Sequence, residues 1–291
     1  MSKKLGFNEN TKLLMIHADD AGLSHSENLA TIQCLEKGIV SSYSIMVPCS
    51  GFREMAVFAK KNPRYDYGIH LTLTCEWESN RFGPVLPISE VQSLVDKNGH
   101  FYKKREELKK KAYVDEVRNE LEAQIEKAYE FGLNPTHLDA HMYSVGTTPE
   151  FFEIYKDLGK KFGLPVLISK EMIDMASGGT GNYITDNDFV VDKLYLGEYE
   201  DFEKGQLRGY YESLFHHLAD GLNVLLIHPA FDDDEMKKLT VNHPNFGAEW
   251  RQIDFDFLTS ENSRSMLKEN NIALISWSDI KKAFFSDNEK R

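Results

Sequence analysis

Short apolar runs alternate with longer helical patterns along most of this chain, and this alternation limits the fold more than any other feature. The expected strands lie at 13–16, 44–48, 67–73, 136–141, 166–168, 223–229 and 272–276, and most of them are short apolar runs. The helical patterns lie at 24–37, 52–61, 114–131, 149–162, 206–219, 248–270 (with a break near Ser260) and 278–285. A strand–helix–strand order predicts parallel strands that are joined by crossover helices.

About seven strand–helix units fit this pattern, and the sequence shows neither an internal repeat nor a long linker between them. We therefore expect one α/β domain over residues 1–291, with a barrel of parallel strands ringed by helices. An open, doubly wound sheet is the alternative architecture. In both architectures the functional face is built at the carboxyl ends of the strands.

Composition excludes several classes of function. The formal net charge of −12 and the pI near 5.3 argue against nucleic acid or an anionic membrane surface as the main partner. No stretch approaches the roughly 18 apolar residues of a membrane-spanning helix, and the first ten residues lack the apolar segment of a signal peptide. Three widely spaced cysteines, Cys34, Cys49 and Cys75, form neither a disulfide framework nor a zinc pattern. We expect a cytoplasmic protein.

Residues 75–113 interrupt the regular pattern and combine aromatic side chains with glycine and proline. An irregular segment of this length is usually functional, and we expect it to cover a site. Trp77 and Phe82 could stack on a sugar ring or could anchor the segment by packing. Arg81, and Arg251 further along the chain, could bind a phosphate or carboxylate or could form surface salt bridges.

Polar side chains collect at the carboxyl ends of four expected strands. They are Asp19 with Asp20, His70, Asp139 with His141, and His228. Because the carboxyl ends of parallel strands meet at one edge of a sheet, we expect these side chains to lie close together. Each also has an ordinary alternative, since adjacent aspartates often cap helices or turns and strand histidines are often hydrogen-bonded core residues.

Taken together, these residue types suit metal-assisted hydrolysis. One carboxylate and two imidazoles can hold a divalent metal and leave positions open for water and substrate. The metal lowers the pKa of a bound water, a spare carboxylate can take its proton, and a spare histidine can protonate a leaving group. Adjacency alone does not say which of Asp19 and Asp20 would bind the metal.

Four segments resemble motifs of the YdjC-like (ChbG-type) carbohydrate deacetylases. Residues 17–24 (HADDAGLS) are similar to the ADDxG opening of that family, and residues 68–74 (GIHLTLT) to its GxHLxLT segment. Residues 135–141 (PTHLDAH) resemble its PTHLDSH segment, and residues 226–229 (LIHP) its late HP segment. The four segments occur in the order and spacing of the family, so the resemblance covers nearly the whole chain.

The resemblance implies a distorted (β/α) barrel, related to the NodB-type polysaccharide deacetylases, that removes N-acetyl groups from sugars. It implies that Asp20, His70 and His141 bind a divalent metal, that Asp19 is the general base and that His228 is the candidate general acid. Mg and Zn are the metals expected first, and Mn, Fe and Co also suit these ligands. The expected substrate is an acetylated saccharide, such as a chitooligosaccharide with or without phosphate, and the family resemblance suggests a homodimer.

One segment departs from the family pattern. Where relatives continue DSHHHVH, this chain has Met142 and Tyr143 after His141, so contacts with the substrate and around the metal can differ. Asp139 is expected either to orient a ligand histidine or to end the strand as a turn residue. Another metal-dependent barrel enzyme acting on sugars (a phosphoesterase or isomerase), a non-catalytic carbohydrate-binding protein and a structural interaction protein stay open as alternatives.

Overall fold

A central strand, β1 (Lys12–Ala21), organises the sheet in the structure, a computed structural model that describes residues 2–8, 11–179 and 181–285. The other strands are β2 (Ser42–Ile45), β3 (Tyr67–Leu71), β4 (Leu138–Ala140), β5 (Lys193–Tyr195), β6 (Leu222–Ile227) and β7 (Ile272–Leu274). Their order is β4-β3-β2-β1-β6-β5, β7 also pairs with β1, and all pairs are parallel. The ends of the domain expected over 1–291 lie outside the described residues.

The sequence of β1 explains its central place. Every residue after Lys12 is buried, as expected for a parallel strand covered on both faces. One side of β1 pairs with β6 from Leu13 to Ala18. The other side pairs with β7 near its start and with β2 near its end. The carboxyl end of β1 therefore projects between β2 and β6, at the centre of the sheet edge.

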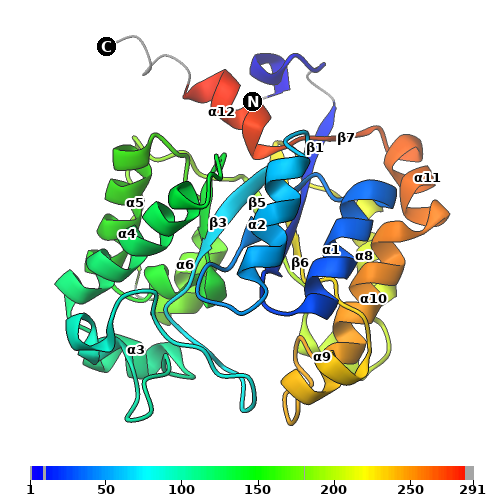
Figure 1. The fold of residues 1–291 in the computed structure, drawn as a ribbon. Helices are drawn as coiled ribbons and strands as arrows, with labels where there is room; N and C mark the ends of the chain where they lie inside the picture. The colour runs from blue at the N-terminus through cyan, green and yellow to red at the C-terminus, as the bar shows by residue number, and fades with distance from the viewer. Residues whose placement is uncertain (1, 9–10, 180, 286–291) are drawn as a thin grey trace.

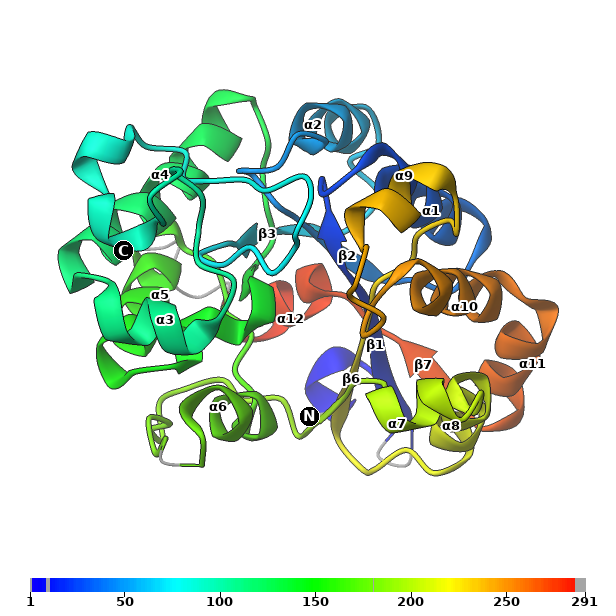
Figure 2. The same ribbon diagram turned by 90° about the horizontal axis from the view of Figure 1, so that it is seen from below.

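Helices flank the strands on both sides (Figure 1). They are α1 (His25–Lys37), α2 (Phe52–Lys61), α3 (Arg105–Lys111), α4 (Val114–Glu130), α5 (Pro149–Phe162), α6 (Lys170–Ser177), α7 (Tyr199–Glu203), α8 (Leu207–His216), α9 (Asp234–Leu239), α10 (Ala248–Thr259), α11 (Glu261–Glu269) and α12 (Trp277–Phe284). Seen from the carboxyl ends of the strands, most of them form a ring around the sheet, and α12 lies behind its centre (Figure 2). No helix among residues 2–8, 11–179 and 181–285 is long and apolar enough to cross a membrane.

The expected distorted barrel of about seven parallel strands is confirmed, as a curled sheet in which the described parts of β4 and β5 form its two edges. The segments that form the strands differ in part from the predicted ones. The run at 166–168 gives only a single bridge between Val166 and Leu138. Instead, β5 arises from a weakly patterned part of the sequence, because only Leu194 among its three residues is buried and no apolar run marks it.

The predicted helices are close to the observed ones. α2 and α5 match the expected bounds, and α1 begins after Ser24, whose side chain accepts a hydrogen bond from the Glu27 amide. The break expected near Ser260 is also present, because this residue ends α10 and caps α11 through the Ser263 amide. The short helices α3, α6, α7 and α9 are not predicted, since none carries a sustained apolar period.

Residues 75–113 cross the carboxyl-end face of the sheet (Figure 2). Their aromatic side chains are packing anchors, because Trp77 is buried and Phe82 packs edge-on against buried Phe101 with ring centres 6.4 Å apart. Arg81 is a salt-bridge residue, 3.2 Å from Asp96. The expected cover over the strand ends is therefore observed, while the sugar-stacking role of Trp77 and Phe82 is not.

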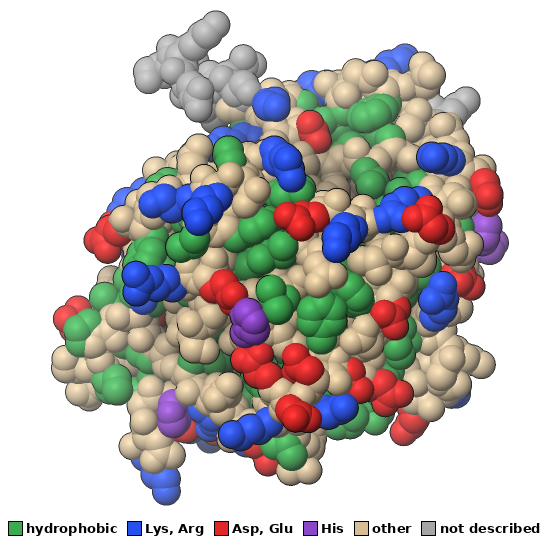
Figure 3. Space-filling model, turned by 45° about the vertical axis from the view of Figure 1, so that its right-hand side comes forward, with side chains coloured by type: hydrophobic (Ala, Val, Ile, Leu, Met, Phe, Trp, Pro, Cys, Tyr) green, Lys and Arg blue, Asp and Glu red, His purple; other side chains and the backbone are tan. Residues whose placement is uncertain are grey.

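The cysteines and surface charges agree with the sequence. Cys34, Cys49 and Cys75 are buried free thiols. On the face shown in Figure 3, acidic and basic side chains are interspersed, and acidic ones gather toward its lower part. This distribution agrees with the negative net charge and offers no basic stripe for a nucleic-acid backbone on that face.

Candidate active site

A bulge near the end of β1 places two carboxylates in one cleft. Ala18 pairs with Tyr43 and Ala21 with Ile45, so that Asp19 and Asp20 together oppose a single residue of β2. Asp20 has a φ of 63°, in the left-handed region. In a regular strand two adjacent side chains point to opposite faces, whereas a bulge re-aims one of them. The adjacent aspartates can therefore act in the same site.

Asp20 is the point where three side chains meet. It is 1% exposed, and its Oδ1 lies 3.0 Å from His141 Nδ1 and 3.4 Å from His70 Nε2. Burial opposes ionisation of this carboxyl, but His141 and Arg251 outweigh burial and hold its pKa well below the usual range. Asp20 is therefore a buried carboxylate that attracts cations.

Each histidine beside Asp20 has a second carboxylate on its other ring nitrogen. His70 Nδ1 lies 3.0 Å from Asp139 Oδ1, and His141 Nε2 lies 2.9 Å from Glu76 Oε2. Burial alone would lower the pKa of His141, but Glu76 and Asp20 raise it to about 9. One of the two roles expected for Asp139 was to orient a histidine of the site. The structure agrees with this role, and the histidine is His70.

The donor atoms of Asp20, His70 and His141 suit a divalent metal. Bonds of about 2.0–2.2 Å to Zn imply separations of roughly 3.0–3.5 Å between neighbouring ligand atoms. The two separations from Asp20 Oδ1, 3.0 and 3.4 Å, lie in this range. The three residues form a group whose ligand atoms lie within 4.8 Å of one another. Two imidazole nitrogens and one carboxylate oxygen fit such an ion.

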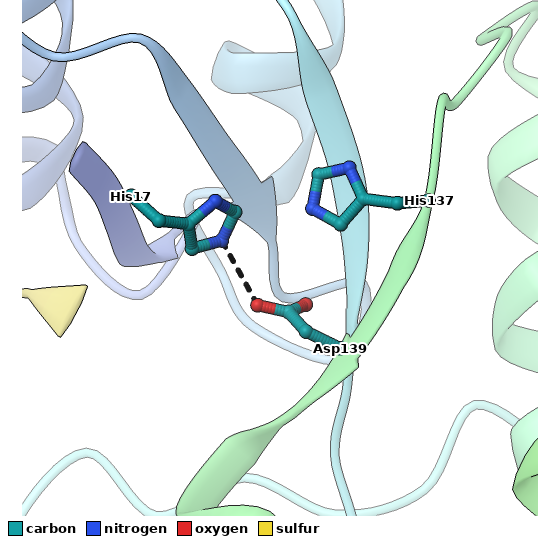
Figure 4. A group of neighbouring side chains, drawn as sticks. All are labelled: His17, His137 and Asp139. Atoms are coloured by element: carbon teal, nitrogen blue, oxygen red, sulfur yellow. Dashed lines mark hydrogen bonds and ion pairs between the residues drawn. The ribbon is translucent and has the colours of Figure 1, made fainter. Parts of the chain in front are cut away.

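A neighbouring group, His17, His137 and Asp139, also brings potential ligand atoms together (Figure 4). His17 Nε2 lies 3.0 Å from Asp139 Oδ2. The His137 ring, however, packs directly on Gly68, where a Cβ atom would overlap it, and stacks on Trp277 with ring centres 5.0 Å apart. Because packing surrounds this ring and neither His17 nor His137 lines the cleft, the group supports the site from behind.

Asp19 lies beside Asp20, His70 and His141, and with His70 and Asp139 it forms another set of potential ligand atoms that lie within 4.8 Å of one another. Its Oδ1 is 3.3 Å from His17 Nε2, and its Oδ2 is 3.7 Å from His228 Nε2. Burial raises the pKa of the Asp19 carboxyl to about 7, although the His70 ring opposes this increase. A carboxylate with a pKa near neutrality is suited to take up a proton.

His228 follows β6 and closes the opposite side of the cleft. Its ring packs against Phe246 with ring centres 4.8 Å apart, and its amide donates to Asp254. Burial lowers the pKa of His228 to about 3, so the ring is neutral near pH 7. Its Nδ1 is buried without a hydrogen-bond partner among the described residues.

All five residues predicted for the site line one cleft of about 260 Å³. The wall beside them is largely apolar and is formed by Met142, Tyr143, Leu167, Met172, Met175, Leu196, Leu226 and Phe246. Further polar groups come from Glu76, Arg105, His243 and Asn245. The cleft thus combines a charged floor with an apolar wall, an arrangement common in small-molecule sites.

The surface salt bridge that was one of the two alternatives for Arg251 is wrong, because its ion pairs are buried. Arg251 lines the cleft but is buried, and its guanidinium donates to Asp20 Oδ2 at 2.8 Å and to Glu27 Oε2 at 2.7 Å. Its Nε also donates to the Phe246 carbonyl at 2.7 Å. Arg251 thus holds the oxygen of Asp20 that faces away from the histidines.

Replacing Arg251 with methionine is expected to destabilise the protein by about 3–5 kcal/mol, because Asp20 would lose its buried cation. Urea unfolding of the chelator-treated protein measures this loss. Arg118→Met is the matched control, since its ion pair with Asp157 is 40–47% exposed and its loss should cost under about 1 kcal/mol. Equal effects of the two substitutions would contradict a structural role for the buried pair.

Four supporting residues were not predicted: His17, Ser44, Glu76 and Glu27. His17 and Ser44 form one buried network with Asp139, in which the Ser44 hydroxyl donates to Asp139 Oδ2 at 2.8 Å. The one available sequence signal was a polar residue within an apolar strand, as at His17 and Ser44. Glu76 and Glu27 lie outside strands and carried no such signal.

Met142 and Tyr143, where the chain departs from the expected motif, line the wall of the cleft next to His141. Met142 and Tyr143 adopt left-handed backbone angles, with φ of 51° and 48°. Arg105 donates to the Met142 carbonyl at 3.0 Å, and the Tyr143 hydroxyl donates to the Leu167 carbonyl at 3.1 Å. These contacts hold the turn after His141 in a conformation that side chains rarely adopt.

Known proteins resemble this chain over nearly its whole length. It is 28% identical to a carbohydrate deacetylase of Thermoanaerobacter pseudethanolicus, covering 93% of this chain and 100% of that protein. It is 30% identical to a carbohydrate deacetylase of Thermus thermophilus (94% and 96%) and 26% identical to a chitooligosaccharide deacetylase of Serratia marcescens (92% and 99%).

A solved structure supports the fold. It is that of an Enterococcus faecalis protein with a proposed role in cellobiose-phosphate cleavage, with a TM-score of 0.76, 24% identity, and coverage of 93% of this chain and 99% of that one. The family model described as YdjC-like protein matches residues 13–269. This match runs from Leu13 in β1 to Glu269 at the end of α11, so it leaves out β7, and it includes every residue of the candidate site. The chain therefore belongs to the YdjC-like protein family.

Proposed function

We propose that this protein is a metal-dependent carbohydrate deacetylase that releases acetate from an N-acetylated sugar. The observation that carries the proposal is the meeting of Asp20, His70 and His141 on the floor of a cleft, with Asp19 beside them. The names of the relatives, carbohydrate deacetylase and chitooligosaccharide deacetylase, support the same activity.

Asp20, His70 and His141 would hold the metal. A divalent cation bound there would polarise the acetyl carbonyl and lower the pKa of a water. Asp139 would keep the His70 imidazole oriented through its other ring nitrogen. Arg251 would hold the remaining oxygen of Asp20, so that Oδ1 stays directed at the histidines.

Asp19 would act as the general base. Its carboxylate is next to the donor group but is not one of its three members, so it is free to take the proton of the attacking water. The water oxygen adds to the acetyl carbon, the carbon–nitrogen bond breaks, and acetate and a free amine result. The amine must gain a proton as it leaves.

His228 is the candidate donor of that proton. Because the ring is neutral near pH 7, His228 must first receive a proton. Asp19 lies 3.7 Å away and would carry the proton taken from water, so it is the nearest source. In this scheme one proton passes from water to Asp19, then to His228, and then to the departing amine.

Acetate measurement tests the proposal. Metal-loaded protein should release equal amounts of acetate and free amine from N-acetylglucosamine, its oligomers or their phosphorylated forms. A chelator should stop the release, and Mg or Zn should restore it. Release of phosphate or isomerisation of the sugar, without acetate, would instead indicate another metal-dependent enzyme. Sugar binding without any turnover would indicate a carbohydrate-binding protein.

A further inference from the structure

Glu76 is an acidic side chain in the cleft that the proposed reaction does not otherwise need. It follows β3 in the irregular segment at 75–113, and its carboxylate is 12% exposed. Its Oε2 lies 2.9 Å from His141 Nε2, while Nδ1 of the same ring faces Asp20 at 3.0 Å. Two carboxylates therefore hold opposite sides of one imidazole.

The direction of the ring nitrogens decides what Glu76 can do. The two nitrogens of an imidazole point in divergent directions, so a carboxylate on Nε2 cannot share a metal ion with Nδ1 of that ring. An ionised carboxylate only accepts hydrogen bonds, so Nε2 carries the hydrogen in this contact. The contact leaves Nδ1, the nitrogen beside Asp20, as the one that can bind a metal.

The two histidines of the site show the same arrangement in opposite orientations. His70 presents Nε2 to Asp20 and gives Nδ1 to Asp139, whereas His141 presents Nδ1 to Asp20 and gives Nε2 to Glu76. Glu76 thus occupies, for His141, the place that Asp139 occupies for His70. The sequence motifs pointed to Asp139, and they did not point to Glu76.

The neighbour of Glu76 fixes its position. Trp77 is buried, with its ring 5.5 Å from the Arg251 guanidinium and its centre 5.0 Å from that of His243. Since Arg251 also holds Asp20, the covering segment and the ligand carboxylate share one support. Glu76 is therefore held at a defined distance from the site by a packed residue.

We infer that Glu76 is a positioning residue that sets the tautomer and orientation of His141, so that the metal binds His141 through Nδ1. The inference rests on the proposed function, because it assumes the metal site. Outer carboxylate partners of ligand histidines typically contribute a factor of about 10–100 to metal affinity. Through Glu76, the segment at 75–113 that covers the cleft would contribute to metal affinity.

Titration of the chelator-treated full chain with Zn2+ in a calorimeter tests the inference. Glu76→Gln is expected to weaken Zn2+ binding by about 10-fold and Glu76→Ala by up to about 100-fold. Glu78→Gln is the matched control, because Glu78 carries the same charge two residues away, is 52% exposed and pairs with Lys103. It should bind Zn2+ as tightly as the unmodified protein.

The visible absorption of the Co2+-substituted protein gives a second readout. It reports the ligand geometry, so it should change in Glu76→Gln and stay unchanged in Glu78→Gln. If both variants match the unmodified protein in Zn2+ affinity and Co2+ spectrum, the inference is overturned. Urea unfolding of the chelator-treated variants separates misfolding from weaker binding, and Glu76→Gln should unfold like the control.

These measurements do not depend on turnover. A protein that binds Zn2+ through a Glu76-dependent site but releases no acetate would contradict the proposed function and leave the positioning role standing. If the unmodified protein releases acetate but Glu76→Gln binds Zn2+ with unchanged affinity, the proposed function is supported and the positioning role of Glu76 is contradicted.

Discussion

Asp19→Asn is expected to lower kcat for acetate release about 100- to 10,000-fold, the range typical of a lost general base. Asparagine has the shape of aspartate but cannot take up a proton from water. Asp19 is not one of the three residues proposed to hold the metal, so the metal content of the variant should stay near normal. Acetate release at saturating metal and elemental analysis of the same sample measure both quantities.

Elemental analysis of the Asp19→Asn variant separates a general base from a metal ligand. If Asp19→Asn also loses its metal, Asp19 is a ligand and its assignment as the base is wrong. If the variant keeps both metal and activity, another group removes the proton. Urea unfolding should show little loss of stability, because burial already raises the pKa of this carboxyl to about 7 and an uncharged side chain is tolerated there.

His70→Ala and His141→Ala are each expected to release the metal and to abolish turnover. Each substitution removes one of the three proposed donors, so metal affinity should fall by more than the factor of about 10–100 that is typical of outer partners. Equilibrium dialysis against Zn2+ measures the metal content, and the acetate assay measures turnover.

His17→Asn is the control for these ligand variants. His17 belongs to the closed group in Figure 4, whose other histidine packs on Gly68. It contacts Asp139 and Asp19 but does not face the cleft, so the variant should keep its metal. If both ligand variants keep their full metal content, the metal does not bind at Asp20, His70 and His141. Loss of metal in His17→Asn alone would likewise contradict that assignment.

The position of the candidate site could be predicted from the sequence because it depends on strand ends. Asp19, His70, His141 and His228 each follow or end a strand that is recognisable by its apolar run or its motif. Parallel strands bring their carboxyl ends to one edge whatever their order in the sheet. The prediction therefore did not require β5, whose position the sequence did not reveal.

The supports of the site could not be predicted, because their contacts join distant parts of the chain. Arg251 meets Asp20 across 231 residues, and Glu76 meets His141 across 65. No local period or spacing marks such a pair. A charged side chain has an exposed salt bridge as its ordinary environment, so the sequence favoured the wrong interpretation of Arg251.

The sequence by itself determined the alternation of strands and helices, the parallel direction of the strands and the edge at which the polar residues meet, while its pattern left a barrel and an open sheet as alternatives. These features follow from apolar periodicity and from the chain direction of parallel strands, which are local properties. Only the tertiary structure decided how the adjacent aspartates differ. The bulge in β1 turns Asp19 and Asp20 into one cleft, and Arg251 and the two histidines then surround Asp20. Those contacts depend on backbone pairing and on packing between distant segments. The positions of two neighbouring residues in the sequence reveal neither.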